Sequence, residues 1–275
     1  MLAGDETSLE LTLGKSAACF VGTQASTKIY RNPNARPCSH SNQVTLEADS
    51  LLVMTPDPVQ AFAAARFTQH QVVRMMPTAS LVLLDWCSAG RVARGERWSF
   101  SHYHSRTELF RAGEAASFPG EGDRPGCRVR RPAEQSFAHR AAVPLGETPS
   151  GATETVAIPN AAGCGWQPER FLLDALLLDP ADGPLAAPER MGRFNCLANL
   201  TVVGPAVRAL SQSLLEEVAV RPLARGARLI CAASPVAGGA LLRLAGESLE
   251  EVSHEIRRHL APIIGLIGGE PWARK

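Results

Sequence analysis

Short runs of apolar and β-branched residues, broken by turn residues, make up most of the chain from residue 7 to residue 110. Many of these runs alternate apolar and polar positions, as a strand with one buried face does. Three runs, GKSAACFV, ADSLLVM and PTASLVL, each place small turn residues before an apolar strand. This recurrence favours a mainly β fold, a β-helix-like solenoid stack of short strands, although a sandwich spaces its turns similarly. The predicted strands are SLELTL, ACFVGT, STKIYR, QVTLEA, LLVMT, QHQVVRM, SLVLLDW and RWSFSHY.

The pattern from residue 169 to residue 275 predicts a second part of the stack, with two C-terminal helices that flank a hairpin. RFLLDALLLD and NCLANLTVVG indicate strands, and ARLICAAS and GALLRLAG indicate an antiparallel hairpin. Gly204 and Pro205 open the first helix. Its predicted apolar face is Val207, Leu210, Leu214 and Val218. Ser248 and Glu251 form a capping box before the second helix. Its predicted apolar face is Val252, Ile256 and Leu260.

Residues 112–168 interrupt this pattern, because glycine and proline are frequent there and apolar periodicity is lost. Such a composition cannot bury enough apolar surface to form a core, so we expect a flexible Gly/Pro-rich insertion. The predicted organisation is therefore a first part of the β-stack over residues 1–111, the insertion, and a second part over residues 169–275.

Composition narrows the choice of partners and compartment. The 275 residues carry a formal net charge of +1, which gives no field to attract nucleic acid or an acidic membrane surface. The seven cysteines are scattered and form no C-x-x-C pair, as expected of reduced thiols in the cytoplasm. The N-terminus lacks a signal-peptide pattern, and no apolar run reaches membrane-spanning length.

Two features could carry chemistry. His102 and His104 would leave the same face of a strand and could chelate a transition metal, but no third ligand follows at a recognisable spacing. In SLVLLDWC, alternation places Asp85 on the same face as Leu81 and Leu83, where an apolar side chain is expected. Such a carboxylate needs an arginine, a file of water or a passing cation. No G-x-S-x-G elbow, Walker A loop or G-x-G-x-x-G fingerprint occurs.

Four arginines follow Asp85, interspersed with acids. Together with these acids the arginines form a nearly neutral group, so we expect ion pairs that fasten adjacent β-coils rather than a basic patch. The arginines are Arg91, Arg94, Arg97 and Arg106, and the acids among them are Glu96 and Glu108.

Three blocks resemble the signature of the urease accessory protein D family (UreD/UreH): GTQASTKIYR, TPDPVQAFAAARF and SLVLLDWCSAGRVARGERWSFSHYHSRTELF. The motif positions that carry this resemblance are Lys28, Tyr30, Asp57, Arg91, Arg94, Glu96, Arg106 and Glu108. In the family a Gly-Asp turn follows earlier strands, whereas this chain begins inside that turn at MLAGDE. We therefore expect N-terminal strands of the stack to be missing.

The resemblance implies a non-catalytic scaffold for urease maturation. It would bind accessory protein F directly and, through it, the GTPase accessory protein G, and dock on apo-urease, where nickel enters. Family position also implies a polar passage that holds Ni²⁺ transiently, with no tightly bound cofactor. Its matching residues are Asp5, Glu6, Thr27, Asp85 and Asp174. We expect the C-terminal helices, which a β-stack does not need for its closure, to dock accessory protein F.

Two other functions remain open from the residues alone. A β-solenoid enzyme acting on polysaccharide would need paired carboxylates across a groove, which Asp85, Glu96 and Glu108 could supply. An RNA-binding β-protein would need a basic face interleaved with aromatic residues, which the net charge and the two tyrosines disfavour.

Overall fold

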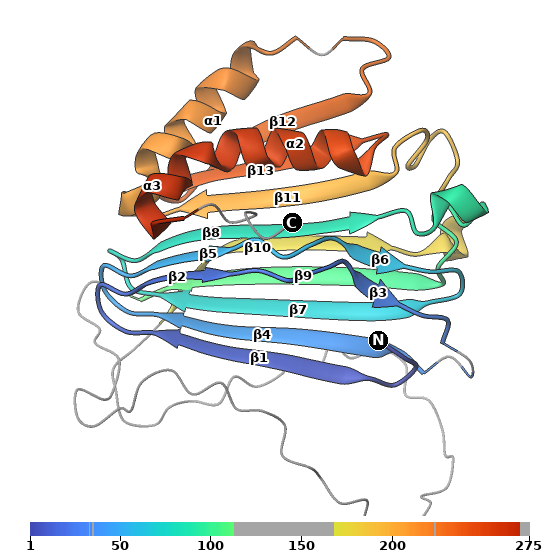
Figure 1. Cartoon of the computed structure of the whole chain (residues 1–275), viewed down its shortest axis with the longest axis horizontal. Coiled ribbons are helices and arrows are strands. Elements are labelled where there is room, and N and C mark those ends of the chain that lie inside the picture. Colours follow the sequence, from blue (N-terminus) through green and yellow to red (C-terminus); the bar gives the residue numbers. More distant parts are fainter. Residues whose placement is uncertain (33, 35, 113–167, 223, 270–275) are drawn as a thin grey trace, which may run out of the picture. The chain divides into compact units, whose positions relative to one another are not determined.

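Two β-sheets face each other in the computed structural model, which describes residues 1–32, 34, 36–112, 168–222 and 224–269 (Figure 1). The first sheet contains, in spatial order, β1 (Glu6–Leu13), β4 (Cys38–Leu46), β7 (Arg66–Met75), β9 (His102–Arg111) and β10 (Glu169–Leu178). The main path of the second sheet is β12 (Leu229–Val236), β13 (Gly239–Gly246), β11 (Cys196–Val203), β8 (Ser80–Ser88), β5 (Leu51–Met54) and β2 (Ala18–Val21). Two short strands, β3 (Thr27–Ile29) and β6 (Val59–Ala61), continue this sheet beside β8.

The N-terminal strands form a β-solenoid. Strands β1, β4, β7 and β9 are parallel and in register, as are β2, β5 and β8, so the chain returns to the same position after each coil. The turns that the sequence repeats stack on one another: Ser16 N donates to Ala48 O at 2.9 Å, and Asp49 N donates to Thr78 Oγ1 at 3.0 Å. The mainly β, solenoid prediction is confirmed. After β9 the added strands β10, β11, β13 and β12 pair antiparallel with their neighbours.

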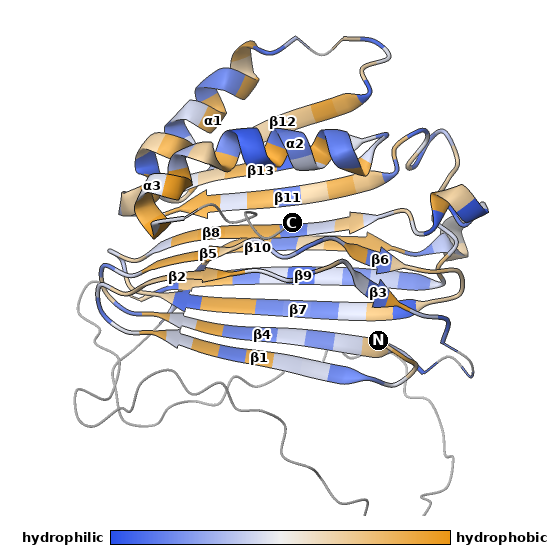
Figure 2. Cartoon of the chain, in the orientation of Figure 1, coloured by the Kyte–Doolittle hydropathy of each residue, from blue (hydrophilic) through white to orange (hydrophobic). Residues whose placement is uncertain are grey.

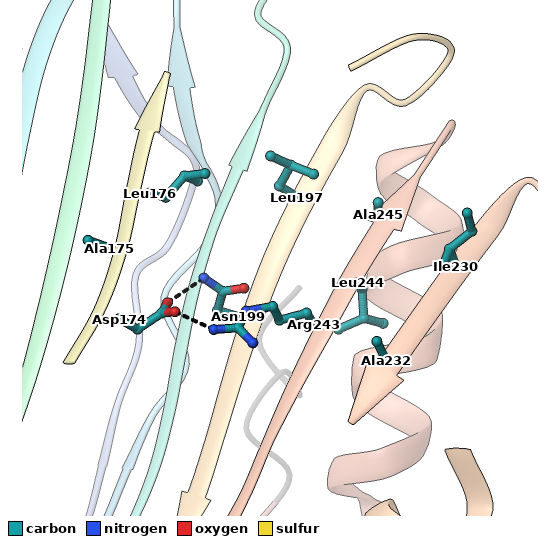
Figure 3. A pocket seen from close by; sticks show the side chains of 10 residues that line it. All are labelled: Asp174, Ala175, Leu176, Leu197, Asn199, Ile230, Ala232, Arg243, Leu244 and Ala245. Atoms are coloured by element: carbon teal, nitrogen blue, oxygen red, sulfur yellow. Dashed lines mark hydrogen bonds and ion pairs between the residues drawn. The ribbon is translucent and has the colours of Figure 1, made fainter. Parts of the chain in front are cut away.

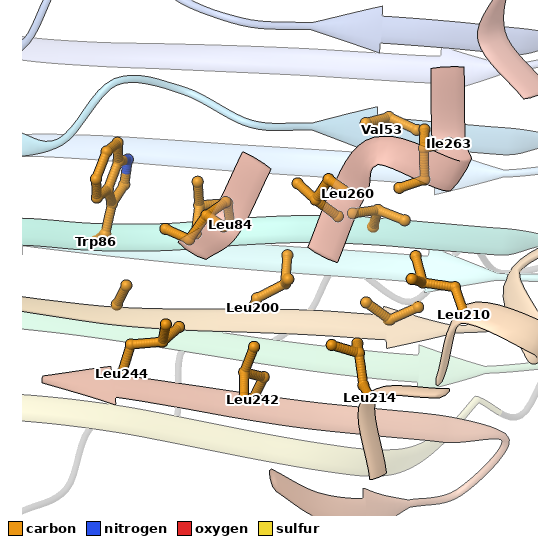
Figure 4. Packing of buried hydrophobic residues seen from close by; sticks show 14 of the residues in the cluster. Val53, Leu84, Trp86, Leu200, Leu210, Leu214, Leu242, Leu244, Leu260 and Ile263 are labelled. Carbon is orange, nitrogen blue, oxygen red and sulfur yellow. The ribbon is translucent and has the colours of Figure 1, made fainter. Parts of the chain in front are cut away.

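The C-terminal helices cover the outer face of the second sheet (Figures 1 and 4). They are α1 (Arg208–Val220), α2 (Leu249–Leu260) and α3 (Ile264–Ile267), and the short 3₁₀ turns are η2 (Val92–Arg94), η3 (Pro180–Asp182), η4 (Pro205–Val207) and η5 (Ala261–Ile263). Leu210, Leu214, Ile256 and Leu260 are buried against strand residues such as Leu200. The predicted helices and apolar faces are confirmed, but the expectation that the stack does not need them is wrong. Their removal would expose the largest apolar cluster of the described residues.

The space between the sheets holds two further apolar clusters, one toward each end of the strands. Phe67, Tyr103 and Leu178 belong to one, and Val73 and Leu109 belong to the other. Figure 2 shows the apolar character of β5, β8 and β11, and the mixed character of β7 and β9. The interior is therefore apolar at its two ends, and buried polar side chains such as Gln69 and Gln71 lie between them.

The boundaries differ from the predictions at three places. RWSFSHY becomes a strand only from His102, because Trp98 has a positive φ of 52° and, like Arg97, donates to Phe194 O instead of pairing with a strand or an acid. The strand β6 was not predicted. Ser248 does cap α2 by accepting from Glu250 N at 3.2 Å, but the capping box is incomplete.

Glu251, the expected second partner in the capping box, instead forms an ion pair with Arg228, in which Glu251 Oε1 lies 3.3 Å from Arg228 Nε. The predicted hairpin is confirmed, with Val236 and Gly239 paired across its turn. The predicted insertion, residues 112–168, lies outside the described residues except for its first and last residue, and Cys127 and Cys164 lie there too. The cysteines of the described residues, Cys19, Cys38, Cys87, Cys196 and Cys231, are all free thiols. None of the helices in the described ranges has the length and apolar character needed to cross a bilayer.

Candidate functional site

The strands of the first sheet carry polar side chains midway along their inward faces. In β7, Phe67 packs in the cluster at one end and Val73 in the cluster at the other, while Gln69 and Gln71 lie between them on the same face. Because the strands pair in register, such residues align in two rows across the sheet, which we call the polar ladder. The first row is Thr7, His40, Gln69 and Ser105, and the second row is Asn42, Gln71, Thr107 and Asp174.

Hydrogen bonds connect neighbouring members of each row. Asn42 Nδ2 donates to Gln71 Oε1 at 3.0 Å, and Gln71 Nε2 donates to Thr107 Oγ1 at 3.2 Å. In the other row, Gln69 Nε2 lies 3.2 Å from Ser105 Oγ. All five side chains are buried, yet Asn42 Oδ1 has no hydrogen-bond partner among the described residues. A buried amide oxygen of this kind is suited to receive a water molecule or a cation.

Asp85 lies opposite the ladder, on β8 of the second sheet. Its Oδ1 accepts from Gln69 Nε2 at 3.0 Å, and its Oδ2 accepts from Ser105 Oγ. Burial raises the pKa of the Asp85 carboxyl above its usual range; the two hydrogen bonds oppose the rise and the negative charge of Asp174 adds to it. A cation that binds Asp85 must therefore compete with a proton, and binding should weaken as pH falls.

Asp174 ends the second row, at the edge strand β10 (Figure 3). Its Oδ2 accepts from Asn199 Nδ2 at 2.7 Å, and its Oδ1 accepts from Arg243 Nη2 at 2.6 Å. Asn199 is the cross-strand partner of both Asp85 and Arg243, so these three residues form one row on the second sheet. Beside them opens a cleft of about 310 Å³, whose apolar wall includes Ile230.

Residues 90–96 of the third signature block, with the sequence GRVARGE, form a salt-bridged clamp between Arg91 and Glu96. Arg91 Nε donates to Glu96 Oε2 at 3.0 Å, a second bond joins Arg91 Nη2 to Glu96 Oε1, and the guanidinium lies 4.3 Å from the centre of the Phe62 ring. The hydrogen bond from Arg91 lowers the pKa of the Glu96 carboxyl below its usual range, and the positive charge of Arg94 adds a smaller effect in the same direction. Arg91 therefore does not supply the arginine that the Asp85 carboxylate could need. Glu96 Oε2 also accepts from Ala63 N at 3.1 Å, so the clamp links this loop to the preceding coil.

A second ion-pair group lies on the outer face of the first sheet. Glu108 Oε1 accepts from Arg106 Nε at 2.9 Å and lies 3.0 Å from His70 Nε2, and its Oε2 accepts from Arg170 Nη1 at 2.7 Å. Arg106 thus pairs with Glu108 and not with Asp85. These contacts join β7, β9 and β10, as the predicted fastening of strands requires.

The other motif residues occupy the first two coils. The main-chain oxygen of Lys28 accepts from the N-terminal amino group at 2.6 Å. The ring of Tyr30 meets that of Phe62 edge-on at 5.2 Å. Asp57 Oδ2 accepts from Thr23 Oγ1 at 2.9 Å. Each of these contacts is structural.

The structure brings Asp85 and Asp174 together but does not bring the other predicted passage residues to them. Asp5 Oδ2 accepts from Leu2 N at 2.6 Å in the N-terminal turn. Glu6 is exposed at the start of β1, directly before Thr7 of the ladder. Thr27 lies on β3 and pairs with β6.

The candidate metal pair lies outside the ladder. The rings of His102 and His104 are 6.4 Å apart between centroids, and His102 Nδ1 lies 3.5 Å from Asp179 Oδ2. Within the described ranges, no group of three or more histidine, cysteine, aspartate or glutamate side chains could hold a metal ion. The histidine pair therefore lacks the further ligands of a tight site.

The three acids that could have supplied paired carboxylates across a groove lie in different places. Asp85 faces the interior, Glu96 lies in the clamp with Arg91, and Glu108 lies on the outer face of the first sheet. The polysaccharide-enzyme hypothesis is wrong for these three residues.

Sequence reasoning missed most of the ladder. The motif QHQVV carried a signal, because Gln69 and Gln71 alternate in phase with Phe67 and Val73. Asn199 and Arg243 gave no comparable signal, since only the register of β11 and β13 brings them beside Asp85.

These features define the class of the protein, a β-solenoid with a ladder of polar side chains in its interior. A family model described as UreD urease accessory protein matches residues 1–118 and 165–273. The urease accessory protein UreD of Sorangium cellulosum is 37% identical over 277 residues, covering 100% of this chain and 69% of the relative. That of Anaeromyxobacter sp. is 34% identical over 274 residues, covering 100% of this chain and 73% of the relative.

A plant relative matches a shorter region: urease accessory protein D of Arabidopsis thaliana is 36% identical over 110 residues, covering 40% of this chain and 37% of the relative. The chain belongs to the UreD urease accessory protein family. It is accordingly an accessory protein of urease maturation and not an enzyme.

Proposed function

We propose that this chain is a cytoplasmic scaffold that bridges apo-urease to accessory proteins F and G, and that Ni²⁺ passes transiently along its polar ladder. The proposed route begins near Thr7, which Asp5 and Glu6 precede in the chain, and ends at Asp85 and Asp174. Thr27, on the first coil, is assigned to the entrance by family position alone. Nucleic acid and membranes are not among the proposed partners.

The chemistry of the ladder supports transport rather than storage. Imidazole and thiolate clusters bind Ni²⁺ tightly, because affinity for such ligands is high near the top of the Irving–Williams series. A conduit must instead hold the ion weakly at successive positions. The ladder offers amide, hydroxyl and carboxylate oxygens on successive strands, as this requires.

The observation that carries the proposal is the environment of Asp85. Its carboxylate lies in the interior, accepts hydrogen bonds from the neutral side chains of Gln69 and Ser105, and forms no ion pair with any lysine or arginine of the described residues. A structural carboxylate at such a position would be expected to pair with a cation. An unpaired one beside an acid such as Asp174 is suited to attract a passing cation.

The test replaces Asp85 by asparagine. In Asp85→Asn the amide oxygen can still accept from Gln69 Nε2, and the Ser105 hydroxyl can rotate to accept from the new amide. We therefore expect a change of only about 1 kcal/mol in the free energy of unfolding. The exposed Glu10→Gln on β1 of the first sheet is the matched control for loss of one negative charge.

The variants are co-expressed with apo-urease and accessory proteins F and G. We expect Asp85→Asn to co-purify with its partners, while the urease it matures contains less nickel by elemental analysis and is less active. Glu10→Gln should match the parent. Normal nickel content with Asp85→Asn would contradict the passage, and loss of soluble protein would instead make Asp85 a structural residue. Failure of the parent chain to co-purify with accessory protein F would contradict the bridging role.

A further inference from the structure

The far end of the polar ladder is closed by a positive charge. Asp174 is the carboxylate that ends the second row of the ladder, and both of its oxygens accept hydrogen bonds, one from Asn199 and one from Arg243 (Figure 3). The carboxylate is mostly covered, with its side chain 15% exposed, whereas the side chain of Arg243 is 50% exposed. All three side chains line the cleft of about 310 Å³.

A cation that reaches this end meets competition for the Asp174 carboxylate. The guanidinium of Arg243 holds Oδ1 at 2.6 Å, and its positive charge repels any second cation close by. Asn199 does not compete in this way, because it is neutral and its side-chain oxygen could itself become a ligand. The Arg243 guanidinium is thus the group that must leave before Asp174 can bind a cation with both oxygens.

The geometry allows that departure. Half of the Arg243 side chain is in contact with solvent, and an arginine can move its charged end into water while its aliphatic part stays on the protein. Solvent screens the exposed guanidinium, and Asn199 still donates to Asp174 Oδ2, so the mostly covered carboxylate keeps one partner when the bond to Arg243 breaks. Asp174, by contrast, is fixed on β10 by its pairing with β9.

We propose that Arg243 gates the Asp174 end of the polar ladder: its guanidinium occupies the carboxylate at rest and swings into the cleft when a divalent cation displaces it. Arg243 is a positioning residue here, because it acts through Asp174. This inference rests on the proposed passage and adds a control on where a cation is released. It predicts that removal of the guanidinium increases the affinity of the protein for Ni²⁺.

The test is calorimetric titration of the purified full chain with Ni²⁺, at fixed pH and ionic strength. We expect Arg243→Gln to bind Ni²⁺ about tenfold more tightly than the parent, which corresponds to about 1.4 kcal/mol. The gain should vanish in the double variant Asp174→Asn/Arg243→Gln, because the freed carboxylate is its source. Thermal melting checks that each variant is folded.

The matched control is Arg193→Gln. Arg193 is also half-exposed and paired with an acid, since its Nε lies 2.9 Å from Glu247 Oε1, but it does not line the cleft. It removes the same charge, so it should leave Ni²⁺ affinity unchanged. Equal gains in Arg193→Gln and Arg243→Gln would overturn the gate in favour of a general effect of net charge.

The remaining outcomes separate the gate from the passage. Unchanged affinity in Arg243→Gln, with weaker binding in Asp85→Asn, would overturn the gate and leave the passage standing. A gain in Arg243→Gln that Asp174→Asn abolishes, with no effect of Asp85→Asn on nickel delivery, would keep the cation site and overturn the passage. If Arg243→Gln does not fold, Arg243→Met takes its place: it keeps an aliphatic side chain but removes the charge that holds Asp174 Oδ1, and an affinity equal to that of the parent would overturn the gate.

Discussion

Replacement of Glu108 by glutamine should destabilise the protein in a strongly pH-dependent way. Glu108 is 7% exposed and pairs with Arg106 of its own strand, with Arg170 of β10 and with His70 of β7. Hydrogen bonding from Arg106, assisted by Arg170 and His70 and opposed by burial, lowers the pKa of its carboxyl from 4.5 to about 2. Glutamine keeps the shape of the side chain and one oxygen acceptor but removes the charge.

The size and the sign of the effect follow from this pKa. The folded and unfolded values differ by about 2.5, which corresponds to about 3 kcal/mol at pH values where the carboxylate is charged. The side chains of Arg106, Arg170 and His70 are 39–45% exposed, so solvent screening reduces this to about 1–2 kcal/mol. Because the folded pKa is the lower one, the contribution is complete above the unfolded pKa and is lost as pH falls from about 4.5 toward 2.

The assay is guanidinium chloride unfolding followed by circular dichroism, for the parent and for Glu108→Gln, at pH 7 and at steps down to pH 2.5. We expect the difference in the free energy of unfolding to be about 1–2 kcal/mol at pH 7 and to shrink toward zero at the acid end. Glu10→Gln on the same sheet should show no such difference. A gap that persists unchanged to pH 2.5 would refute the electrostatic reasoning and indicate a packing effect.

Two further predictions concern the backbone. Gly204 has φ +109°, and a Cβ there would lie 2.3 Å from a main-chain oxygen, so Gly204→Ala should cost about 2–4 kcal/mol of stability and lower the melting temperature. Gly226 has φ +85° but no atom within 4 Å of the position that a Cβ would take, so the control Gly226→Ala should cost only about 1 kcal/mol. Arg111 and Glu169 are cross-strand partners at the ends of β9 and β10, so a short Gly-Ser linker can replace the segment between these strands. We expect this replacement to leave solubility and co-purification with partners intact, and aggregation of the shortened chain beside a soluble parent would contradict it.

Local patterns predicted the elements well where burial follows the period of a strand or helix. In α1, Leu210 and Leu214 are buried as the helical spacing indicated. The strand β8 was predicted from its apolar run, and its alternation placed Asp85 correctly on the face of Leu81 and Leu83. Trp98 shows the limit of this reasoning: its aromatic neighbours indicate a strand, but a positive φ and a bond to Phe194 O hold it in a loop.

The partners of Asp85 could not be predicted in the same way, because they depend on register between distant segments. An arginine nearby in the sequence was one expectation, yet Arg91 pairs with Glu96 in the loop after β8 and Arg106 pairs with Glu108 on β9. Gln69 and Ser105 reach Asp85 because β7 and β9 pair in parallel and lie opposite β8 across the interior. In a parallel solenoid, the length of each coil decides which residues of successive strands lie beside each other. That length can be read from a sequence only when the strand boundaries are known.

The polar side chains of the ladder occur together, and not singly, in an otherwise apolar interior, because they satisfy one another's hydrogen bonds. A buried amide or hydroxyl without a partner costs about 1–3 kcal/mol, so one polar residue at such a depth would weaken the fold. Repetition on successive strands removes most of that cost, because Asn42 bonds to Gln71 and Gln71 to Thr107. Each of these bonds contributes only about 1 kcal/mol net, so oxygens can exchange one partner for another at little cost. The same arrangement therefore keeps the interior satisfied when the protein is at rest and makes its oxygens available to the cation whose passage we propose.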